Sequence, residues 1–413
     1  MSGERASADS AMTGDRARWK EIAVSLLKLG ATSYGGPAIM GVMQTELQDK
    51  RQWVSKERFV EGLSLVNMLP GATATQLGIF LAYARGGWWA GLLGGVCFVL
   101  PAFFVMVALT IAYATLGVSP IIRDALYGLG PVVLGIFIIA LYRLGRTAMS
   151  TVPQALICVV AAVLALAKPI GVASILVLAG AAGLLIFHSR KPATIAWASA
   201  ASAAAIVPVF AWPASGPVAV VADAAAQPAS LVEIAAYFFK VGAFTVGGGL
   251  AMIAFMQQQV VEQFHWLTPR EFIDGLALGQ FTPGPILMVA AYVGYKLVGV
   301  PGAIVAASAA FLPSFVLMLA VLPVLDRVRK LAWTRAALKG MGAAVIGVLA
   351  VSLVRLAPYA LPDVFAVVIL VATVTVLLLS RVSAIQLMLA GSVLGVLRAR
   401  LPGAKVARAV TGV

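Results

Sequence analysis

The sequence is poor in charged residues. Asp, Glu, Lys and Arg make up 11% of the 413 residues, whereas a soluble domain carries about a quarter. Hydrophobic residues make up 61%, so the composition excludes an ordinary soluble protein and predicts an integral membrane protein. Membrane strands are excluded because the apolar runs are continuous, near the ~20 residues of a crossing helix. These runs are 88–116, 121–144, 152–167, 170–187, 193–212, 300–325, 336–356, 364–379 and 384–397.

Cysteine and histidine are almost absent, with only Cys97, Cys158, His188 and His265. So few ligands give neither a disulfide framework nor a zinc or haem site. The motifs HExxH, GxSxG and GxxxxGK[ST] are missing as well. We therefore expect no enzyme, no ATP-driven pump, no metal and no cofactor. The charge of +14 is spread over short loops, as in membrane proteins, and forms no stripe for nucleic acid.

The two halves of the chain match at an offset of 212 to 213 positions. The segment "LLKLGATSYGG" (26–36) aligns with "FFKVGAFTVGG" (238–248), and "LPAF" (100–103) aligns with "LPSF" (312–315). Lys, Gly-Gly, Pro-Gly and Arg recur in the same order in both halves. This pattern predicts a duplicated structural unit.

Each half has six apolar segments, and an extra one, 193–212, precedes an Ala/Pro-rich linker. One extra crossing inverts the second half, which is a plan typical of secondary transporters. If 193–212 lies on the surface instead, the halves are parallel. The predicted organisation is a disordered cytoplasmic tail (1–20), a first repeat (21–192), the extra segment with its linker (193–230), a second repeat (231–400) and a tail (401–413).

Each half begins with two segments that Gly and Pro interrupt. If these segments crossed fully, the basic residues between them would face outward, so the positive-inside tendency favours re-entrant hairpins. The predicted fold is therefore all-α and polytopic, an inverted repeat whose halves each begin with two broken or re-entrant helical hairpins. We expect a multi-pass protein of the bacterial inner (plasma) membrane with a cytoplasmic amino terminus.

The breaks predict an anion site. Unpaired backbone groups at membrane depth are tolerated only beside protein or a watery cavity, and helix amino termini bind anions. We expect four half-helix ends to converge near the midplane, with neutral donors around them. The candidate substrate-binding residues are Lys28, Ser33, Gly35, Gly36, Pro37, Asn67, Pro70, Gly71, Thr73, Gln76, Lys240, Thr245, Gly247, Gly248, Gln280, Thr282, Pro283 and Gly284.

Two ionisable pairs recur at matching positions. Lys28 and Lys240 lie inside apolar stretches, where burying a charge costs about 2.5 to 3.5 kcal/mol, so we read them as buried substrate-binding cations. The alternative is that they extend to the interface. Glu61 and Asp274 are candidates for coupling to protons, although an acid near a helix start is also stabilised by the helix dipole.

Other recurring residues have structural interpretations. Arg143 and Arg355 end their helices and are expected to stabilise a carboxyl-terminal dipole. "TPRE" (268–271) predicts a capping box with proline at the first helical position, and Ser55 is the equivalent cap.

The segments "KLGATSYGGPA", "NMLPGATATQLGIFLAYARGGWWAG", "FTVGGG", "GQFTPGP" and "FLPSF" resemble the two-domain chromate transporters from about residue 20 to 400. The resemblance implies export of chromate from the bacterial cytoplasm, chromate resistance, inverted halves and sulfate as a close analogue. This sequence departs from the family at two places. Many relatives have arginine at the position of Lys28. Many also have LPGP followed by an acid where this chain has Leu69-Pro70-Gly71-Ala72-Thr73. The missing acid puts proton coupling through the first half in doubt and suggests export driven by voltage.

Three alternatives stay open from the sequence. A passive anion channel or a sulfate-selective transporter would use the same pore chemistry. A membrane enzyme or scaffold fits less well, because catalytic motifs are missing. The expected partners are an oxyanion and the lipid bilayer, and the oligomeric state, including a homodimer, is open.

Overall fold

The computed structural model describes residues 18–34, 36–116, 119–167, 170–188, 229–245, 249–324, 332–380 and 382–400. These ranges form helices and loops and contain no β-strand, so the all-α prediction is confirmed. After a first helix (18–32) come α2 (Gly36–Met43), η1 (Gln44–Lys50), α3 (Lys56–Val66), α4 (Thr73–Leu116), α5 (Pro120–Ala148), α6 (Val152–Ala167) and α7 (Val172–His188). The second half contains α9 (Leu231–Ala243), α10 (Ala251–Met256), η2 (Gln257–Gln263), α11 (Pro269–Phe281), η3 (Ile286–Met288), α12 (Val289–Val321), η4 (Leu322–Val324), α14 (Ala332–Ala360), α15 (Val364–Leu379) and α16 (Ala384–Ala399).

Four of the described helices are long and apolar enough to cross a membrane: Thr73–Leu116, Pro120–Arg146, Ile286–Val324 and Trp333–Ala360. Shorter apolar helices follow in each half, and α6 and α15 begin and end where the apolar runs predict. The predicted extra segment (193–212) and the linker up to residue 228 lie outside the described residues.

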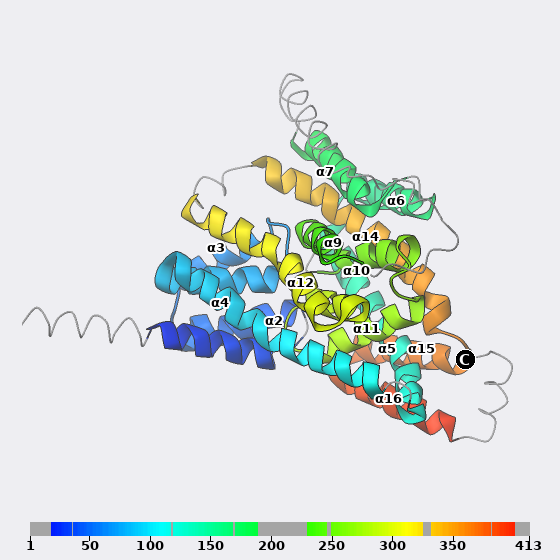
Figure 1. The fold of residues 1–413 in the computed structure, drawn as a ribbon. Coiled ribbons are helices and arrows are strands. Elements are labelled where there is room, and N and C mark those ends of the chain that lie inside the picture. The colour runs from blue at the N-terminus through cyan, green and yellow to red at the C-terminus, as the bar shows by residue number, and fades with distance from the viewer. Residues whose placement is uncertain are drawn as a thin grey trace, which may run out of the picture.

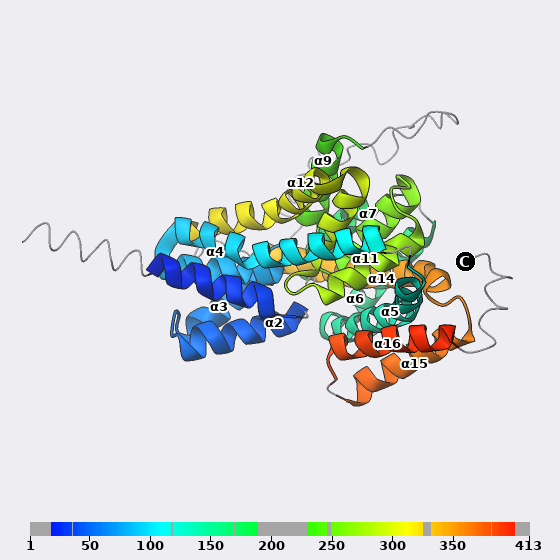
Figure 2. The same cartoon turned by 60° about the horizontal axis from the view of Figure 1, so that its bottom comes forward.

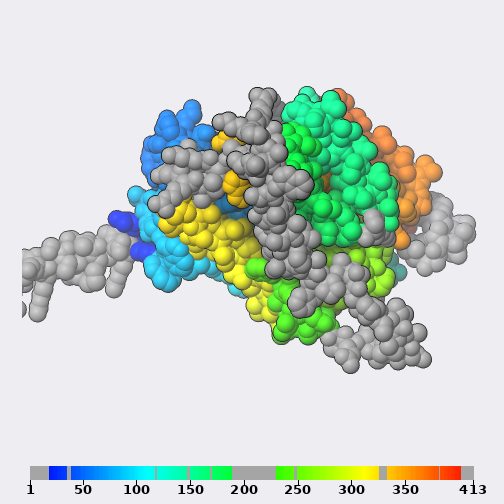
Figure 3. All heavy atoms as spheres, turned by 90° about the horizontal axis from the view of Figure 1, so that it is seen from above, coloured from blue at the N-terminus to red at the C-terminus, as the bar shows by residue number. Residues whose placement is uncertain are grey.

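The helices form three groups. We call the helix 18–32 with α2, η1, α3 and α4 the first lobe, and α9, α10, η2, α11 and α12 the second lobe. The scaffold consists of α5, α6, α7, α14, α15 and α16. Figures 1 and 2 show α2 and α3 at one end of the molecule, the second lobe in the middle, and the scaffold helices α15 and α16 at the other end. Figure 3 shows the same order from above, with the first lobe in blue and cyan, α6 and α7 in teal, and orange helices beyond them.

The helices before each long crossing are short. Residues 18–32 and 36–50 form two helical stretches on either side of the first break, and at ~1.5 Å per residue neither covers the ~30 Å of a bilayer core. α4 and α12 also break, at Gly87 (φ +79°) and Gly299 (φ +70°), so their crossing parts begin at the next residue. These lengths agree with the predicted broken hairpins.

The scaffold is built by exchange between the halves. α5 of the first half packs against α15 and α16 of the second, while α14 of the second half packs against α6 and α7 of the first. The contact is close because glycine lies at the crossing: a Cβ on Gly128 would lie 2.0 Å from the carbonyl oxygen of Gly391. At the equivalent crossing, a Cβ on Gly340 would lie 2.0 Å from the carbonyl oxygen of Ala179. Each sequence repeat thus contributes one lobe and half of an interlocked scaffold.

The helix caps predicted at Ser55 and Thr268 are present in the structure. Ser55 accepts the N–H of Arg58 at 3.2 Å, and Thr268 forms the complete capping box with Glu271. Arg143 and Arg355 bind carboxyl-terminal carbonyls, but these belong to the helix of the other half. Arg143 donates to Leu377 in α15 at 3.1 Å, and Arg355 donates to Ala165 in α6 at 2.7 Å.

The second lobe packs more extensively against the scaffold than the first lobe does. α11 packs against α5 and α14, and α10 packs against α14 and α7, whereas α2 and α3 pack against α4 and η1. As a result, Phe255 and Ile273 are 0% and 3% exposed, while their repeat equivalents Val42 and Val60 are 44% and 52% exposed. One continuous hydrophobic core joins the second lobe to the scaffold and includes Ala102 and Met106 of α4. A second core fills the first lobe and includes Met318 and Leu319 at the end of α12.

Candidate functional site

The broken segments of the two halves meet inside the protein. The backbone N–H of Gly71 donates to the carbonyl of Thr245 at 2.6 Å, and the N–H of Gly284 donates to the carbonyl of Ser33 at 2.8 Å. Gly71 and Gly284 are repeat equivalents, as are Ser33 and Thr245, so the two bonds are images of one another. The second break of each half is therefore held against the first break of the other half. We call this place the junction.

The first breaks bring two hydroxyl groups into the junction. Ser33 and Thr245 are both buried. Thr245 Oγ1 donates to its own helix, at the carbonyl of Val241, whereas Ser33 Oγ has no hydrogen-bond partner among the described residues. α2 begins at Gly36 and continues through Pro37, so the predicted half-helix start is present. Three predicted residues of these breaks, Gly35, Gly247 and Gly248, lie outside the described residues.

The second breaks depend on glycine. Gly71 and Gly284 have φ of +126° and +93°, a region that side-chain-bearing residues rarely adopt. A Cβ on Gly71 would lie 2.4 Å from Ser314 Oγ and 2.6 Å from Gln76 Nε2. Gln76 is fully buried, and its Nε2 donates to the carbonyl of Pro70 at 2.7 Å. These contacts fix the turn between α3 and α4.

The other predicted donors are placed less uniformly. Thr282 is buried and donates to its own helix, at the carbonyl of Leu278, and Pro283 is buried beside it. Thr73 and Gln280 are partly buried. Asn67 is exposed, and its amide donates to the carbonyl of Leu63. Thr282 and Pro283 are therefore inside the protein with Gln76, whereas Thr73, Gln280 and Asn67 are more exposed.

One residue of the junction was missed from the sequence. Ser314 Oγ, on α12, accepts the N–H of Ala72 at 2.8 Å and is fully buried. Its repeat equivalent is Ala102, whose Cβ is 3.0 Å from the position that a Cβ on Gly284 would occupy. The residue equivalent to Ala72 is Pro285, which has no N–H, so no hydroxyl is needed there to accept one. The alignment of the two halves already shows this difference, because "LPAF" aligns with "LPSF" and Ala72 aligns with Pro285.

The two predicted cations differ, and the interpretation of Lys28 as buried is wrong. Lys28 is exposed because it shares a helical face with Val24, four residues earlier, which is also exposed. The opposite face, with Leu26 and Leu29, packs into the first lobe. Lys240 is partly buried. The structure therefore does not place the Lys28 side chain in the protein interior.

The two predicted coupling acids also differ. Glu61 Oε2 accepts from Arg58 at 2.8 Å, and both side chains are partly exposed. Asp274 is buried; its Oδ2 accepts from the hydroxyl of Tyr113 at 3.0 Å, and Arg270 Nε lies 3.5 Å from its Oδ1. Tyr113 is on α4, so this carboxylate is held between the halves. Within the described ranges no three His, Cys, Asp or Glu side chains gather to hold a metal.

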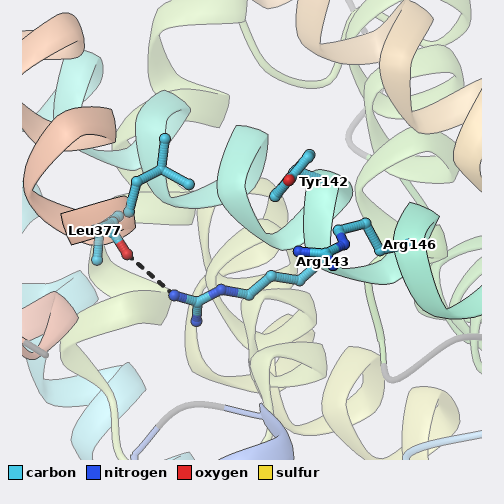
Figure 4. Close-up of a pocket in the computed structure, with 5 residues that line it drawn as sticks. Tyr142, Arg143, Arg146 and Leu377 are labelled. Carbon is cyan, nitrogen blue, oxygen red and sulfur yellow. Dashed lines mark hydrogen bonds between the residues drawn. The ribbon is translucent and has the colours of Figure 1, made fainter. Parts of the chain in front are cut away.

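Two surface hollows lie on parts of the first lobe and the scaffold. Figure 4 shows one of about 500 Å³, where Arg143 reaches Leu377 and the Arg146 side chain extends along the same helix. It is lined by Tyr142, Arg143, Arg146, Leu377 and Leu378. The other, also about 500 Å³, is on the first lobe and is lined by Gly41, Val42, Thr45, Glu46 and Lys50. Basic side chains thus line both hollows.

The chain matches known proteins over most of its length. The family model described as chromate transporter matches residues 20–186 and 232–396, once in each half. "Chromate transport protein" of Cupriavidus metallidurans is 32% identical over 91% of this chain and 92% of its own length. "Probable chromate transport protein" of Synechococcus elongatus is 33% identical over 83% and 86%, and "Chromate transport protein" of Pseudomonas aeruginosa is 31% identical over 82% and 81%. No solved structure matches the chain.

The double match agrees with the duplication and with the two broken-helix lobes of the fold. Members of this family are transporters and not enzymes, and several apolar helices make this chain a multi-pass membrane protein. The chain belongs to the chromate transporter family.

Proposed function

We propose that the protein exports chromate, with sulfate as a second substrate, and that the anion binds at the junction. The observation that carries this proposal is the pair of reciprocal bonds, Gly71 to Thr245 and Gly284 to Ser33. Each bond joins one chain break of the first half to one of the second half in the protein interior. The relatives' names supply the substrate, because three of them are called chromate transport proteins.

The chemistry of a dianion explains why several breaks are needed. A doubly charged oxyanion leaves water only if several donors replace its hydration at once. The helix starts at α2 and α4 present unpaired amides and the positive end of a helix dipole. The Ser33 hydroxyl and the Lys240 ammonium complete the proposed donors. The amides of Gly71 and Gly284 are already bonded, so these glycines position the site rather than contact the anion.

The membrane potential favours export. Moving one charge through 100 mV is worth about 2.3 kcal/mol, so a dianion leaving a negative interior gains about 4.6 kcal/mol. Voltage alone is therefore a sufficient driving force. Chromate flux that responds to a pH gradient and not to an imposed voltage would contradict this part of the proposal.

In this proposal a proton gradient is a second driving force beside the voltage. Asp274 is the group that carries the proton. Its carboxylate is buried between the halves and accepts from Tyr113. Glu61, at the equivalent position, is partly exposed and paired with Arg58. Coupling through the second half alone fits the absence of an acid after Pro70–Gly71 in the first half. Asp274→Asn should then remove any response to a pH gradient while voltage-driven flux remains.

We place the protein in the bacterial inner membrane with the amino terminus in the cytoplasm. The two halves are inverted in this proposal, with repeat boundaries at 21–192 and 231–400. Support comes from the basic residues between α2 and α3, which stay cytoplasmic when the broken segments are re-entrant. Thiol labelling of single cysteines from each side of the membrane tests this orientation.

The proposal is tested by chromate uptake into everted membrane vesicles, where export appears as uptake. Ser33→Ala should raise the KM for chromate by about tenfold, because a charged partner makes one lost hydrogen bond worth about 1.5 kcal/mol or more. Ser33→Thr is the conservative control, since the other half has threonine there, and Thr115→Ala on the exposed end of α4 is the neutral control. Sulfate should compete in the same assay.

Unchanged uptake by Ser33→Ala and by an equivalent Lys240→Ala variant would contradict binding at the junction. Single-channel currents without saturation or counterflow would identify a passive channel instead of a carrier.

A further inference from the structure

A partly buried ion pair joins the second lobe to the scaffold. Both carboxylate oxygens of Glu262, on η2, lie 3.3 Å from Arg355 Nη1 on α14, and each side chain is 19% exposed. Gln257 Nε2 donates to the same carboxylate at 2.6 Å. Arg355 Nη2 donates to the carbonyl of Ala165 at 2.7 Å, so one guanidinium joins η2, α14 and α6.

A second polar contact between the second lobe and the scaffold lies at the start of α7. The side-chain oxygen of Gln258, next to the ion pair on η2, accepts the backbone N–H of Val172 at 2.9 Å. Val172 is the first residue of α7, where helix N–H groups lack intrahelical partners. The second lobe therefore contacts the scaffold through two polar groups as well as through apolar packing.

The repeat gives every one of these residues an equivalent. Asp49 corresponds to Glu262, Arg143 to Arg355, Thr45 to Gln258 and Ala384 to Val172. Two of the four already adopt the equivalent positions. Arg143 makes the same helix-end bond as Arg355, to the carbonyl of Leu377, and Ala384 is the first residue of α16 as Val172 is of α7.

The other two equivalents are on an open surface. Asp49 and Thr45 are exposed on η1, on the same helical face as Val42, because the three residues are three and four positions apart. Val42 and Thr45 line one hollow, and Arg143 lines the other (Figure 4). Asp49 and Arg143 are therefore both exposed, on two different groups of helices, and do not form the ion pair that Glu262 and Arg355 form.

The scaffold offers the first lobe a surface equivalent to the one that the second lobe occupies. α11 lies on α5 and α14, which contact one another and are themselves repeat equivalents. α5 with α15 and α16 repeats the arrangement of α14 with α6 and α7. The scaffold helices that contact the second lobe therefore have repeat equivalents within the scaffold.

We propose that the transporter has a second conformation in which the first lobe docks on the scaffold and the second lobe separates from it. In that state Asp49 pairs with Arg143, and Thr45 meets the start of α16, while the Glu262–Arg355 and Gln258–Val172 contacts are broken. Exchange of like contacts keeps the two states close in free energy, as a two-state carrier requires. This inference rests on the proposed transport function and names the residues that alternate.

Paired cysteines distinguish the two states. In a background with Cys97→Ala and Cys158→Ala, Gln258→Cys with Val172→Cys traps the state described here, and Thr45→Cys with Ala384→Cys traps the proposed one. With a short thiol cross-linker in membrane vesicles, both pairs should react within a single chain. Each cross-link should abolish chromate uptake, and reduction should restore it. Adding Glu262→Gln should raise the yield of the Thr45/Ala384 pair and lower that of the Gln258/Val172 pair.

A charge exchange tests the ion pair itself. Asp49→Arg should slow uptake, and Asp49→Arg combined with Arg143→Asp should restore it, whereas Asp49→Arg combined with Arg146→Asp should not. Arg146 is the matched control because it lines the same hollow three residues further along α5. Restored uptake by both combinations would contradict a specific pairing.

Three outcomes overturn the inference. In the first, the Thr45/Ala384 pair fails to cross-link while the Gln258/Val172 pair reacts. In the second, the Thr45/Ala384 pair reacts only between two chains, so the exposed face of η1 is a dimer interface. In the third, the cross-linked protein transports at the normal rate. Cross-linking needs no chromate, so normal cross-linking with no chromate uptake by the wild type would reject the substrate and keep the conformational change.

Discussion

The two lobes have matching sequences and similar backbones but different surroundings. Both contain a π-helical stretch after the first break, and both have a tight turn at Pro-Gly before the long helix. In the second lobe the outer face of these elements is buried against the scaffold, and in the first lobe the same face is exposed. The difference shows that the repeat specifies each lobe, while docking on the scaffold decides which side chains are buried.

The polar groups follow the same division. In the second half Asp274 and Glu262 are held by residues from other helices, Tyr113 and Arg355. In the first half the equivalent Glu61 is paired within α3, and Asp49 is exposed. A charge that is solvated on the exposed face of the first lobe would be costly on the buried face of the second lobe unless it has a partner. The comparison between the lobes can be tested by substituting equivalent residues and measuring both.

The largest expected effect is at the junction glycines. Gly71→Ala should cost about 3 kcal/mol and remove most transport, because a Cβ would lie 2.4 Å from Ser314 Oγ in a backbone conformation that alanine rarely adopts. Gly284→Ala should cost less, since its nearest neighbour, Ala102 Cβ, is 3.0 Å away. Thermal unfolding in detergent and vesicle uptake measure the two effects. Equal losses would mean that the unequal packing of the two turns has no consequence.

The next effect is at the two arginines that bind helix ends. Arg355→Leu should destabilise the protein by about 2 kcal/mol, because it leaves the Glu262 carboxylate partly buried without its ion-pair partner. Arg143→Leu should cost about 1 kcal/mol, the usual contribution of a hydrogen bond such as that to Leu377. Melting temperatures of the purified variants give the comparison. A larger loss for Arg143→Leu would contradict the docking of the second lobe on the scaffold through Glu262 and Arg355.

The hydroxyl at the junction comes third. Ser314→Ala should cost about 1.5 kcal/mol, because it leaves the buried N–H of Ala72 without a partner. Ala72→Pro removes that N–H and copies the other half, so Ser314→Ala should cost much less in that background. A double-mutant cycle on thermal stability measures the coupling. Additive losses would show that the hydroxyl and the amide act independently.

The two lysines should differ in transport. Lys240→Ala should reduce chromate uptake by about tenfold, equal to about 1.4 kcal/mol, because the partly buried ammonium is a proposed donor to the anion. Lys28→Ala should have a smaller effect, since that side chain is exposed. Uptake is normalised to the amount of protein in the membrane. The reverse order would place the substrate path along the first lobe.

The smallest effect is a pH dependence at the start of α15 that has no counterpart at the start of α6. Burial raises the pKa of Asp363, but the Tyr127 hydroxyl, the start of α15 and Arg398 together hold it below its usual value. A depressed pKa stabilises the folded state above about pH 4 and loses this contribution as the pH falls through the folded value. We expect at most about 1 kcal/mol, because solvent screens a partly exposed group.

The matched position in the first half is neutral. At the start of α6 the N–H of Thr151 donates to Gln154 instead of to an acid. Asp363→Asn should therefore reduce the fall in melting temperature between pH 6 and pH 3, while Gln154→Ala should leave that fall unchanged. Melting temperatures between pH 3 and pH 6 provide the measurement, and an identical pH profile for Asp363→Asn and the wild type would contradict the assignment.

Much of the fold could be predicted because it depends on local patterns. Apolar runs gave the bounds of α6 and α15, and Pro and Gly located the breaks at Gly71 and Gly284. Ser55 and Thr268 were recognisable as caps, since a capping bond joins residues three positions apart.

The rest depends on contacts between distant segments. The repeat is symmetric in sequence, so nothing in it says which lobe docks on the scaffold. That contact decides whether Asp274 is buried and brings Tyr113 to it. Lys28 was assigned to the interior because it lies in an apolar stretch, although its spacing from the exposed Val24 indicates an outer face.

The exchange of helices in the scaffold has a consequence for biosynthesis. When the ribosome has released the first half, α5, α6 and α7 are in the membrane, but the helices that they pack against, α14, α15 and α16, have not been made. Glycine-lined surfaces such as that around Gly128 must wait for their partners, so the first half cannot complete its fold alone. A gene split between the halves would yield function only when both products are made together in one membrane.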